Sequence, residues 1–159
     1  MARSGRPWHE ADVIDDPVQR RLRDSLYAEA MLLADEARGY FEDVGPAESA
    51  SLDPLTRVRF SCESLKVTTR IMHVVAWLLM RRAVDAGEIA PTEPRLPSRR
   101  LGVSPGVDEV AYSAMPDRAC ALIDASVDLH RRVARLDRAV DEEAASPARL
   151  MQERLARSF

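Results

Sequence analysis

The sequence predicts an all-α protein, an antiparallel three-helix bundle with a long central helix, a long loop before the third helix and a short C-terminal helix. In three long stretches, apolar residues recur at alternating steps of three and four, which is the spacing of one helix face. Capping residues, prolines and glycines bound these stretches, and no segment alternates with the two-residue period of a half-buried strand. The 159 residues amount to about one domain. We expect a flexible arm at residues 1–14, the bundle at 15–145 and a tail at 146–159.

The first helix is expected over about residues 16–43. Asp16 is a residue type that caps helix starts, and Pro17 suits the first helical position, where its missing N–H has no consequence. Gly45-Pro46 is expected to end the helix. The apolar stripe of this helix consists of Val18, Leu22, Leu26, Ala30, Leu33, Ala37 and Tyr40. Only a short polar link follows, so the first two helices should be antiparallel neighbours.

The central helix is expected over about residues 53–86, with Asp53 as the cap, Pro54 at the first position and Gly87 just past the end. A seam with coiled-coil spacing runs along it, and a second apolar stripe lies beside the seam. The seam consists of Leu55, Val58, Cys62, Leu65, Thr69, Met72, Ala76, Leu79 and Ala83, and the second stripe of Val67, Ile71, Val74 and Leu78.

From Ile71 to Met80 the central helix is apolar nearly all round, apart from His73. Such a segment has to be covered on several sides, and it is shorter than the roughly 20 residues that span a bilayer. One candidate cover is a second copy of the chain in a homodimer. The other is the loop of residues 88–114, folded back over the helix. The predicted dimer interface consists of Ile71, Val74, Val75 and Leu78.

The loop of residues 88–114 contains several prolines and glycines and has no lasting period. Connections of this length are uncommon in compact domains and are usually functional or mobile. A short helix is expected to begin at Ser104-Pro105. The third long helix is expected over about residues 115–143, where apolar residues again recur at steps of four and three.

Composition and motifs give little support to enzyme chemistry. The net charge of −3 provides no bulk attraction to nucleic acid or to an anionic membrane. His9, His73 and His130 have no partner at the spacing of a helical metal pair, and no phosphate-binding loop or nucleophile motif occurs. The N-terminal residues lack the apolar core of a signal peptide. We therefore expect a non-enzymatic cytoplasmic protein with no cofactor, no metal and no membrane contact.

Two polar groups are candidates for binding a protein partner. The first is a patch on the central helix, which has ordinary helix surface as its alternative. The second is a basic cluster in the loop, which either meets an acidic partner surface or is merely solvated. The patch consists of Glu63, Ser64, Lys66, Thr68, Thr69 and Arg70, and the cluster of Arg95, Arg99 and Arg100.

A transcriptional or DNA-associated regulator is one function that stays open beside that of a protein-binding module. In that case the basic cluster contacts DNA or a DNA-bound factor, and binding falls steeply with salt. The long helices argue against a helix-turn-helix, which needs short helices joined by a tight turn. Contact with nucleic acid is therefore the less favoured interpretation.

Two segments resemble a known family. The run Cys62–Pro91, CESLKVTTRIMHVVAWLLMRRAVDAGEIAP, closely resembles the long second helix of the regulator of CtrA degradation family, the RcdA-like proteins of alphaproteobacteria. Residues 25–41, SLYAEAMLLADEARGYF, resemble the first helix of that family. The most specific part is ESLKVTTR at residues 63–70 together with the apolar residues that follow it.

The resemblance implies a three-helix bundle that forms homodimers and acts as an adaptor in cell-cycle-regulated proteolysis. Members of the family help to deliver substrates, including the master cell-cycle regulator after which the family is named, to the ClpXP protease. They do so together with a response-regulator primer and, in some cases, a cyclic-di-GMP effector protein. No enzymatic activity and no cofactor are implied, and the expected location is the cytoplasm, at the cell pole with the protease.

Overall fold

The computed structural model describes residues 17–144 and residue 151, and every regular element within these residues is a helix or helical turn. The predicted all-α bundle is thereby confirmed. The long helices are α1 (Pro17–Gly39), α3 (Pro54–Asp85) and α5 (Asp117–Ala144). The short elements are a π-helical turn (Tyr40–Val44), α2 (Gly45–Ser49), two 3-10 turns (Glu93–Arg95 and Pro97–Arg99) and α4 (Glu109–Tyr112). The predicted arm, the Asp16 cap and, except for Met151, the C-terminal helix lie outside the described residues.

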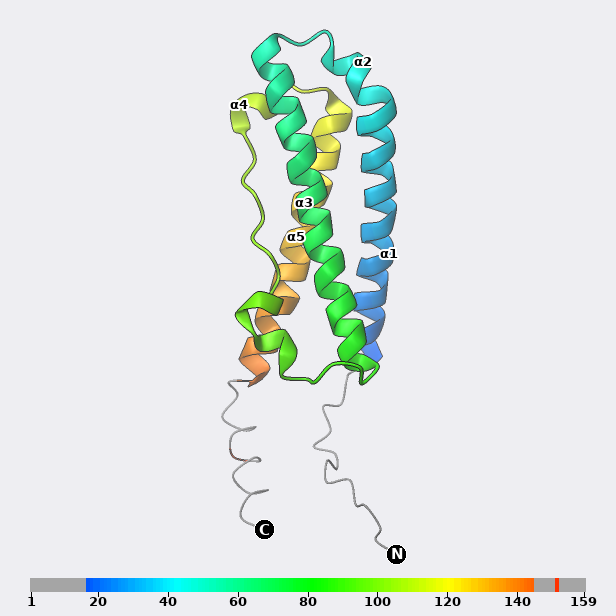
Figure 1. Ribbon diagram of the computed structural model, residues 1–159, viewed down its shortest axis with the longest axis vertical. Helices are drawn as coiled ribbons and strands as arrows, with labels where there is room; N and C mark the ends of the chain where they lie inside the picture. Colours follow the sequence, from blue (N-terminus) through cyan, green and yellow to red (C-terminus); the bar gives the residue numbers. More distant parts are fainter. Residues whose placement is uncertain (1–16, 145–150, 152–159) are drawn as a thin grey trace, which may run out of the picture.

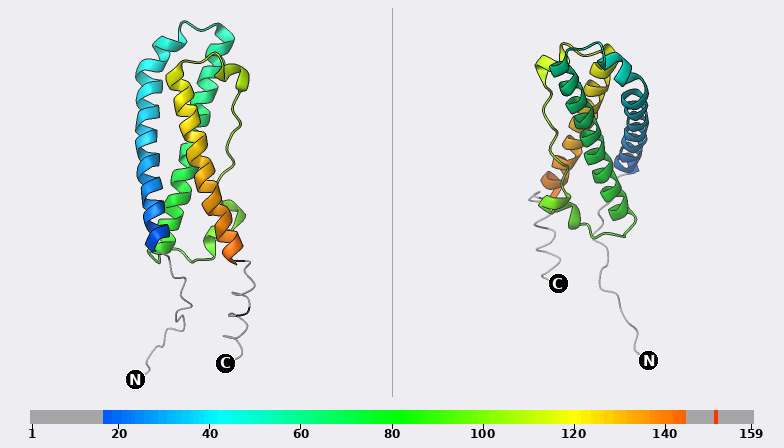
Figure 2. Two further views of the ribbon diagram at one scale, coloured as in Figure 1. Left: turned by 180° about the vertical axis from the view of Figure 1, so that it is seen from behind. Right: turned by 45° about the horizontal axis from the view of Figure 1, so that its top comes forward.

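The three long helices run along the length of the molecule, but they do not alternate in direction. α1 and α3 are antiparallel, as predicted (Figure 1). α5 is parallel to α3, since Arg70 donates to Ser126 Oγ at 3.3 Å and Trp77, further along α3, donates to Asp137 Oδ1 at 2.7 Å. The left view of Figure 2 shows from behind that α3 and α5 run in the same direction. The third helix thus differs from the predicted antiparallel arrangement.

The parallel pair explains the long loop. Because α3 and α5 share a direction, the chain has to return over the length of the bundle before α5 begins. Two 3-10 turns lie beside the end of α3, and an extended segment then runs back to α4, near the start of α3 (Figures 1 and 2). We call the extended residues 101–108 the strap. An extended chain advances about 3.3 Å per residue, whereas a helix advances about 1.5 Å. The strap therefore covers the return distance with few residues, and its sequence shows no helical period.

The start and end of α3 follow the local signals in the sequence. Asp53 accepts hydrogen bonds from the backbone N–H groups of Leu55 and Thr56, both at 3.1 Å. Gly87, just past the helix, has a φ of 73°, a conformation that glycine adopts without a Cβ penalty. Both ends of the central helix are therefore specified by residues within two or three positions of it.

The end of α1 differs from the prediction. Gly45-Pro46 does not stop the helical path but begins α2, because a π-helical turn carries the chain into it and proline is tolerated in a first helical turn. The rings of Tyr40, Phe41 and Phe60 meet edge to face at this end of the bundle, with centroids 5.1 to 6.4 Å apart. The phenol of Tyr40 donates to Glu48 at 2.6 Å, and burial together with this bond raises the pKa of Tyr40.

The core uses only one of the two apolar stripes of α3. The second stripe is buried against α1 and α5, whereas the seam with coiled-coil spacing lies on the flank of α3 that no other described element covers. The buried residues are Val67, Ile71, Val74 and Leu78, and the exposed ones are Leu55, Val58, Leu65, Met72 and Leu79. Heptad spacing thus identified the seam as an apolar flank without identifying which element, if any, packs against it.

Candidate functional site

The exposed seam of α3 forms an apolar row along one flank of the bundle, which we call the open row. It consists of Leu55, Val58, Leu65, Met72 and Leu79, each at least 45% exposed. Single exposed apolar side chains are normal on a protein surface. A row of large ones at heptad spacing is a different feature, because it is the pattern that packs against a second helix. The open row is therefore a candidate contact surface.

A groove of about 370 Å³ lies beside the open row, between α1 and α3. The hydroxyl groups of Ser64 and Thr68 on its α3 side donate to carbonyl oxygens of their own helix, at 2.7 and 3.1 Å. The polar atoms of this wall are thus already paired, and most of the lining is apolar, with Arg38 and Glu42 as its charged residues. Its lining includes Ala34, Ala37, Phe41, Ser64, Thr68 and Met72. Such a groove suits the apolar side chains of a docking helix.

The residues predicted as a dimer interface are largely covered within one chain. Ile71, Val74 and Leu78 are at most 5% exposed, because α1 and α5 pack against them. Val75 is half-buried against the core. The apolar run from Ile71 to Met80 is thus only partly covered by its own bundle and loop, because Met72 and Leu79 within it belong to the exposed open row.

The strap lies across α3 and α5, which is the second cover considered from the sequence. Gly102 passes directly over the ring of His73: a Cβ built on Gly102 meets that ring at 2.5 Å. On the other side, Nε2 of His130 lies 2.7 Å from the carbonyl oxygen of Gly102. The two histidine rings are 6.5 Å apart. Glycine is therefore required where the strap enters the groove between the two helices.

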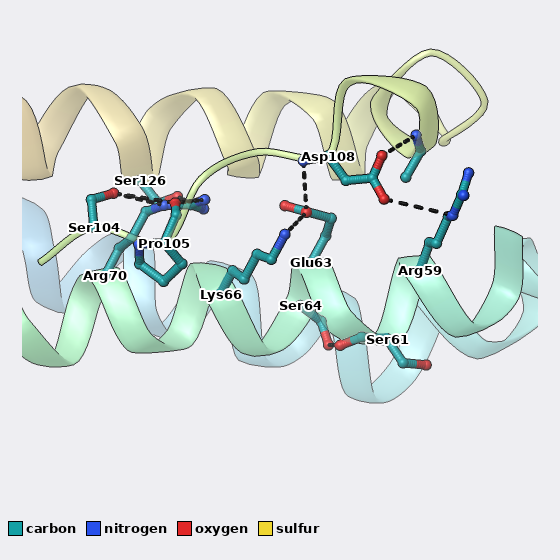
Figure 3. A network of polar contacts seen from close by, with 11 residues as sticks. Arg59, Ser61, Glu63, Ser64, Lys66, Arg70, Ser104, Pro105, Asp108 and Ser126 are labelled. Carbon is teal, nitrogen blue, oxygen red and sulfur yellow. Dashed lines mark hydrogen bonds and ion pairs between the residues drawn. The ribbon is translucent and has the colours of Figure 1, made fainter.

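Arg70 holds the middle of the strap (Figure 3). Its side chain is fully buried, and its Nη2 donates to the carbonyl oxygen of Pro105 at 2.7 Å. Nε donates to Ser104 Oγ at 3.2 Å, and Nη1 donates to Ser126 Oγ of α5 at 3.3 Å. All three acceptors are neutral. Burial lowers the pKa of Arg70, and the negative charge of Glu63 opposes that shift.

Glu63 holds the end of the strap. Its Oε1 accepts from Lys66 Nζ at 2.6 Å and from the backbone N–H of Asp108 at 3.1 Å (Figure 3). Asp108 in turn caps α4 by accepting from Ala111 N at 3.0 Å, and its carboxylate lies 3.6 Å from Arg59. These bonds connect α3, the strap and α4.

The polar patch predicted on α3 is therefore divided by the fold. Glu63 and Arg70 are 1% and 0% exposed and bind the chain's own strap, so they present no surface to a partner in this conformation. Lys66 is half-buried beside Glu63, and Ser64 lies half-buried on the opposite flank, in the groove between α1 and α3. The sequence contained no signal for this, because the residues that cover Glu63 and Arg70 come from a loop more than thirty positions away.

The basic cluster of the loop is also divided. Arg100 donates to both carboxylate oxygens of Asp137 at 3.0 Å and forms a second ion pair with Asp141. These bonds raise the pKa of Arg100 and fasten the chain just before the strap. Arg95 is exposed, and Arg99 lies 3.9 Å from Glu93 on the surface. Acidic residues of α5, distant in sequence, thus neutralise part of the predicted cluster.

Metal and membrane chemistry receive no support in the described part of the chain. Within residues 17–144 and Met151, no group of three or more His, Cys, Asp or Glu side chains is placed to hold a metal ion. None of the helices in the same residues combines the length and the apolar character that crossing a membrane requires.

The chain was compared with families, curated sequences and solved structures. The family model described as "Protein of unknown function (DUF1465)" matches residues 14–159. Among solved structures, the crystal structure of RcdA from Caulobacter crescentus CB15 is similar, with 30% sequence identity and a TM-score of 0.62 over 75% of this chain and 90% of that chain. No curated protein sequence matches. The resemblance noted in the sequence is confirmed: the chain belongs to the DUF1465 family, which contains RcdA.

Proposed function

We propose that this protein is a non-enzymatic adaptor in cell-cycle-controlled proteolysis, which helps to deliver substrates such as a master cell-cycle response regulator to the ClpXP protease. The observation that carries the proposal is the similarity to RcdA, at 30% identity over 75% of the chain. The family resemblance adds a response-regulator primer as a partner and, for some members, a cyclic-di-GMP effector protein. On this proposal the protein works in the cytoplasm, at the cell pole with the protease.

The open row supports a role in binding proteins. An adaptor acts by holding two proteins close to each other, which raises their effective concentration. It needs contact surfaces and no reacting groups. The open row and the adjoining groove between α1 and α3 provide an apolar surface that suits a helix.

We also propose a homodimer in which α3 contributes the open row to the interface. A two-fold axis across α3 would bring the row against its symmetry mate. The test is the mass in solution, measured by light scattering, of Leu65→Glu and of its control Leu32→Glu. Leu65 and Leu32 are 67% and 72% exposed, but Leu32 lies on α1 and outside the groove. We expect a dimer for wild type and Leu32→Glu and a monomer for Leu65→Glu; a monomeric wild type contradicts the proposal.

The adaptor role is tested by degradation of a substrate in vitro. Purified ClpXP is mixed with a short-lived cell-cycle regulator and the response-regulator primer, with and without this protein. We expect a shorter substrate half-life when the protein is present and no loss of substrate when ClpXP is left out. An unchanged half-life across several candidate substrates contradicts the adaptor role. Affinity purification from cells that carry a substrate-trapping protease then identifies the natural partners.

The alternative of a DNA-associated regulator is tested with a DNA duplex at two salt concentrations. Asp137 and Asp141 hold Arg100, so Arg95 and Arg99 are the members of the basic cluster that face solvent. The adaptor proposal predicts no duplex binding even at low salt. Binding at low salt that falls steeply as salt is added favours the alternative.

A further inference from the structure

The hydrogen bonds between the strap and the groove between α3 and α5 reach mainly the backbone of the strap, while its Leu101 and Val107 side chains pack against the core. The contacts reach the carbonyl oxygens of Gly102 and Pro105 and the backbone N–H of Asp108, and the groups that bind them are side chains of the two helices. Every peptide possesses these backbone atoms. The strap therefore occupies the groove in the way in which an extended peptide ligand would occupy it.

The strap leaves several polar groups of this groove unmatched. Arg70 is fully buried, yet no carboxylate among the described side chains of residues 17–142 lies within ion-pair distance of its guanidinium. Glu63 Oε2 and His73 Nδ1 are buried and have no hydrogen-bond partner among the residues that the structure describes. A buried cation that meets only neutral acceptors, and buried polar atoms that meet none, are both unfavourable. A carboxylate opposite Arg70 would give this buried cation the charged acceptor that the strap does not provide.

We propose that the groove between α3 and α5 is a binding site for an extended peptide of a partner protein with a carboxylate opposite Arg70, and that the strap fills this site in the free protein. The proposal goes beyond the adaptor function and does not depend on it, because it concerns what fills the groove. When the partner binds, its acidic segment takes the place of residues 101–108, and the strap moves into solvent.

The carboxylate of the partner peptide determines whether the peptide can replace the strap. The strap belongs to the same chain, so it competes at an effective concentration in the millimolar range. A peptide with only neutral groups offers Arg70 what the strap already offers. Charge-assisted hydrogen bonds are roughly twice as strong as neutral ones, and a carboxylate can bind guanidinium through two parallel bonds. We therefore expect an acidic peptide to bind at least about tenfold more tightly than its neutral counterpart, a difference that corresponds to about 1.4 kcal/mol.

Two glycines of the strap provide a matched pair of variants. In Gly102→Ala the new Cβ meets the His73 ring at 2.5 Å, which pushes the strap out of the groove. In Gly106→Ala the new Cβ has nothing within 4 Å, so the strap stays in place. Circular dichroism and thermal unfolding check that both full-length variants are folded, and hydrogen exchange at residues 101–108 reports whether the strap is released.

The probes are two fluorescent peptides with the sequence of residues 100–109, RLGVSPGVDE, one of them carrying S104D. Binding is followed by anisotropy. We expect Gly102→Ala to show fast exchange in the strap and to bind the S104D peptide at least about tenfold more tightly than the peptide that keeps Ser104. Wild type and Gly106→Ala should bind both peptides weakly. The proposal is overturned if a released strap is accompanied by no peptide binding, or by equal binding of the two peptides.

A second variant decides the question if the His73 ring moves aside in Gly102→Ala and the strap stays in place. Ser104→Asp in the full chain puts the missing carboxylate beside Arg70, whose Nε already lies 3.2 Å from Ser104 Oγ. We expect exchange in the strap to slow by at least about tenfold, and the slowing to disappear when Arg70→Met is added. Exchange in Ser104→Asp that is unchanged or faster than in wild type contradicts the proposal.

Discussion

Two flanks of α3 reverse the usual distribution of residue types. On the flank beneath the strap, Glu63 and Arg70 are 1% and 0% exposed. On the open row, Leu65 and Met72 are 67% and 64% exposed. These four residues lie within ten positions of one helix. Charged side chains are thus inside and large apolar side chains outside along the same turns.

The element that packs against a helix flank decides which of its side chains are buried. The strap brings backbone polar atoms against α3, and charged side chains with long stems can reach them. No described element covers the open row, so its leucines and methionine remain in water. A helix can therefore contain two apolar stripes that are both suitable for a core. Packing against other elements determines which of the two is buried.

The largest effect is expected from a charge placed in the buried stripe. Val74 is fully buried between the helices, so Val74→Glu buries an unpaired carboxylate and should lower the free energy of unfolding by on the order of 4 kcal/mol. Denaturant unfolding followed by circular dichroism measures the change. A stability equal to that of wild type would show that Val74 is not in the core.

A smaller loss is expected when the centre of the strap contact is removed. Arg70→Met keeps an unbranched side chain but takes the donor from Pro105 O and from two serine hydroxyls. Loss of these bonds destabilises, while removal of a buried charge offsets part of the loss, so we expect a decrease of about 2 kcal/mol. Hydrogen exchange should accelerate at residues 101–108 more than in α1. Uniform acceleration in all helices would contradict a local role.

A pH-dependent effect is expected at the end of the strap. The N–H of Ala111 and the positive charge of Arg59 hold the pKa of the Asp108 carboxyl below its usual range. Its contribution to stability is therefore present above the pKa of an unfolded aspartate, about 3.9, and is lost as the pH falls through the lower folded value. The Tm of Asp108→Asn should lie below that of wild type at pH 5 to 7, and the gap should narrow below about pH 4.

The control for this titration is Asp43→Asn, which changes an exposed carboxylate on the turn after α1. It should leave the Tm unchanged over the same range of pH. A gap for Asp108→Asn that stays constant with pH would mean that the amide disturbs packing and that the carboxylate charge is not involved.

The smallest effect on stability is expected on the open row. Leu65→Glu changes an exposed residue, so the free energy of unfolding of the monomer should stay within about 0.5 kcal/mol of wild type. Measuring unfolding at several protein concentrations separates this effect from any loss of association. A destabilisation similar to that of Val74→Glu would show that the two flanks of α3 do not differ in burial.

Sequence reasoning was accurate where structure depends on adjacent residues. Asp53 and Gly87 mark the ends of α3 because capping and a positive φ are local properties. The resemblance of Cys62–Pro91 identified the family for a related reason, since it compares residues in order along the chain. The predicted helix end at Gly45-Pro46 was inaccurate, because a π-helical turn leads the chain from α1 into α2 at this point.

The contacts of the candidate site could not be predicted from the sequence, for a physical reason. Glu63, Arg70 and Arg100 were recognised as candidates, but their partners are the strap and α5, more than thirty positions away. A local sequence pattern does not indicate which distant carbonyl or carboxylate group will accept a hydrogen bond from a long side chain. The residues were therefore identified, and their role was not.

An all-α bundle of three long helices and the ends of the central helix were predictable from the sequence, because helix formation follows from spacing and capping within a few residues. The direction of α5 relative to α3, the loop segment that lies over the central helix and the apolar stripe that remains exposed became evident from the folded chain. These features depend on the free energy of packing distant segments together. Two stripes of similar composition on one helix are about equally suited to burial, so the stripe that becomes buried depends on the elements that pack against the helix.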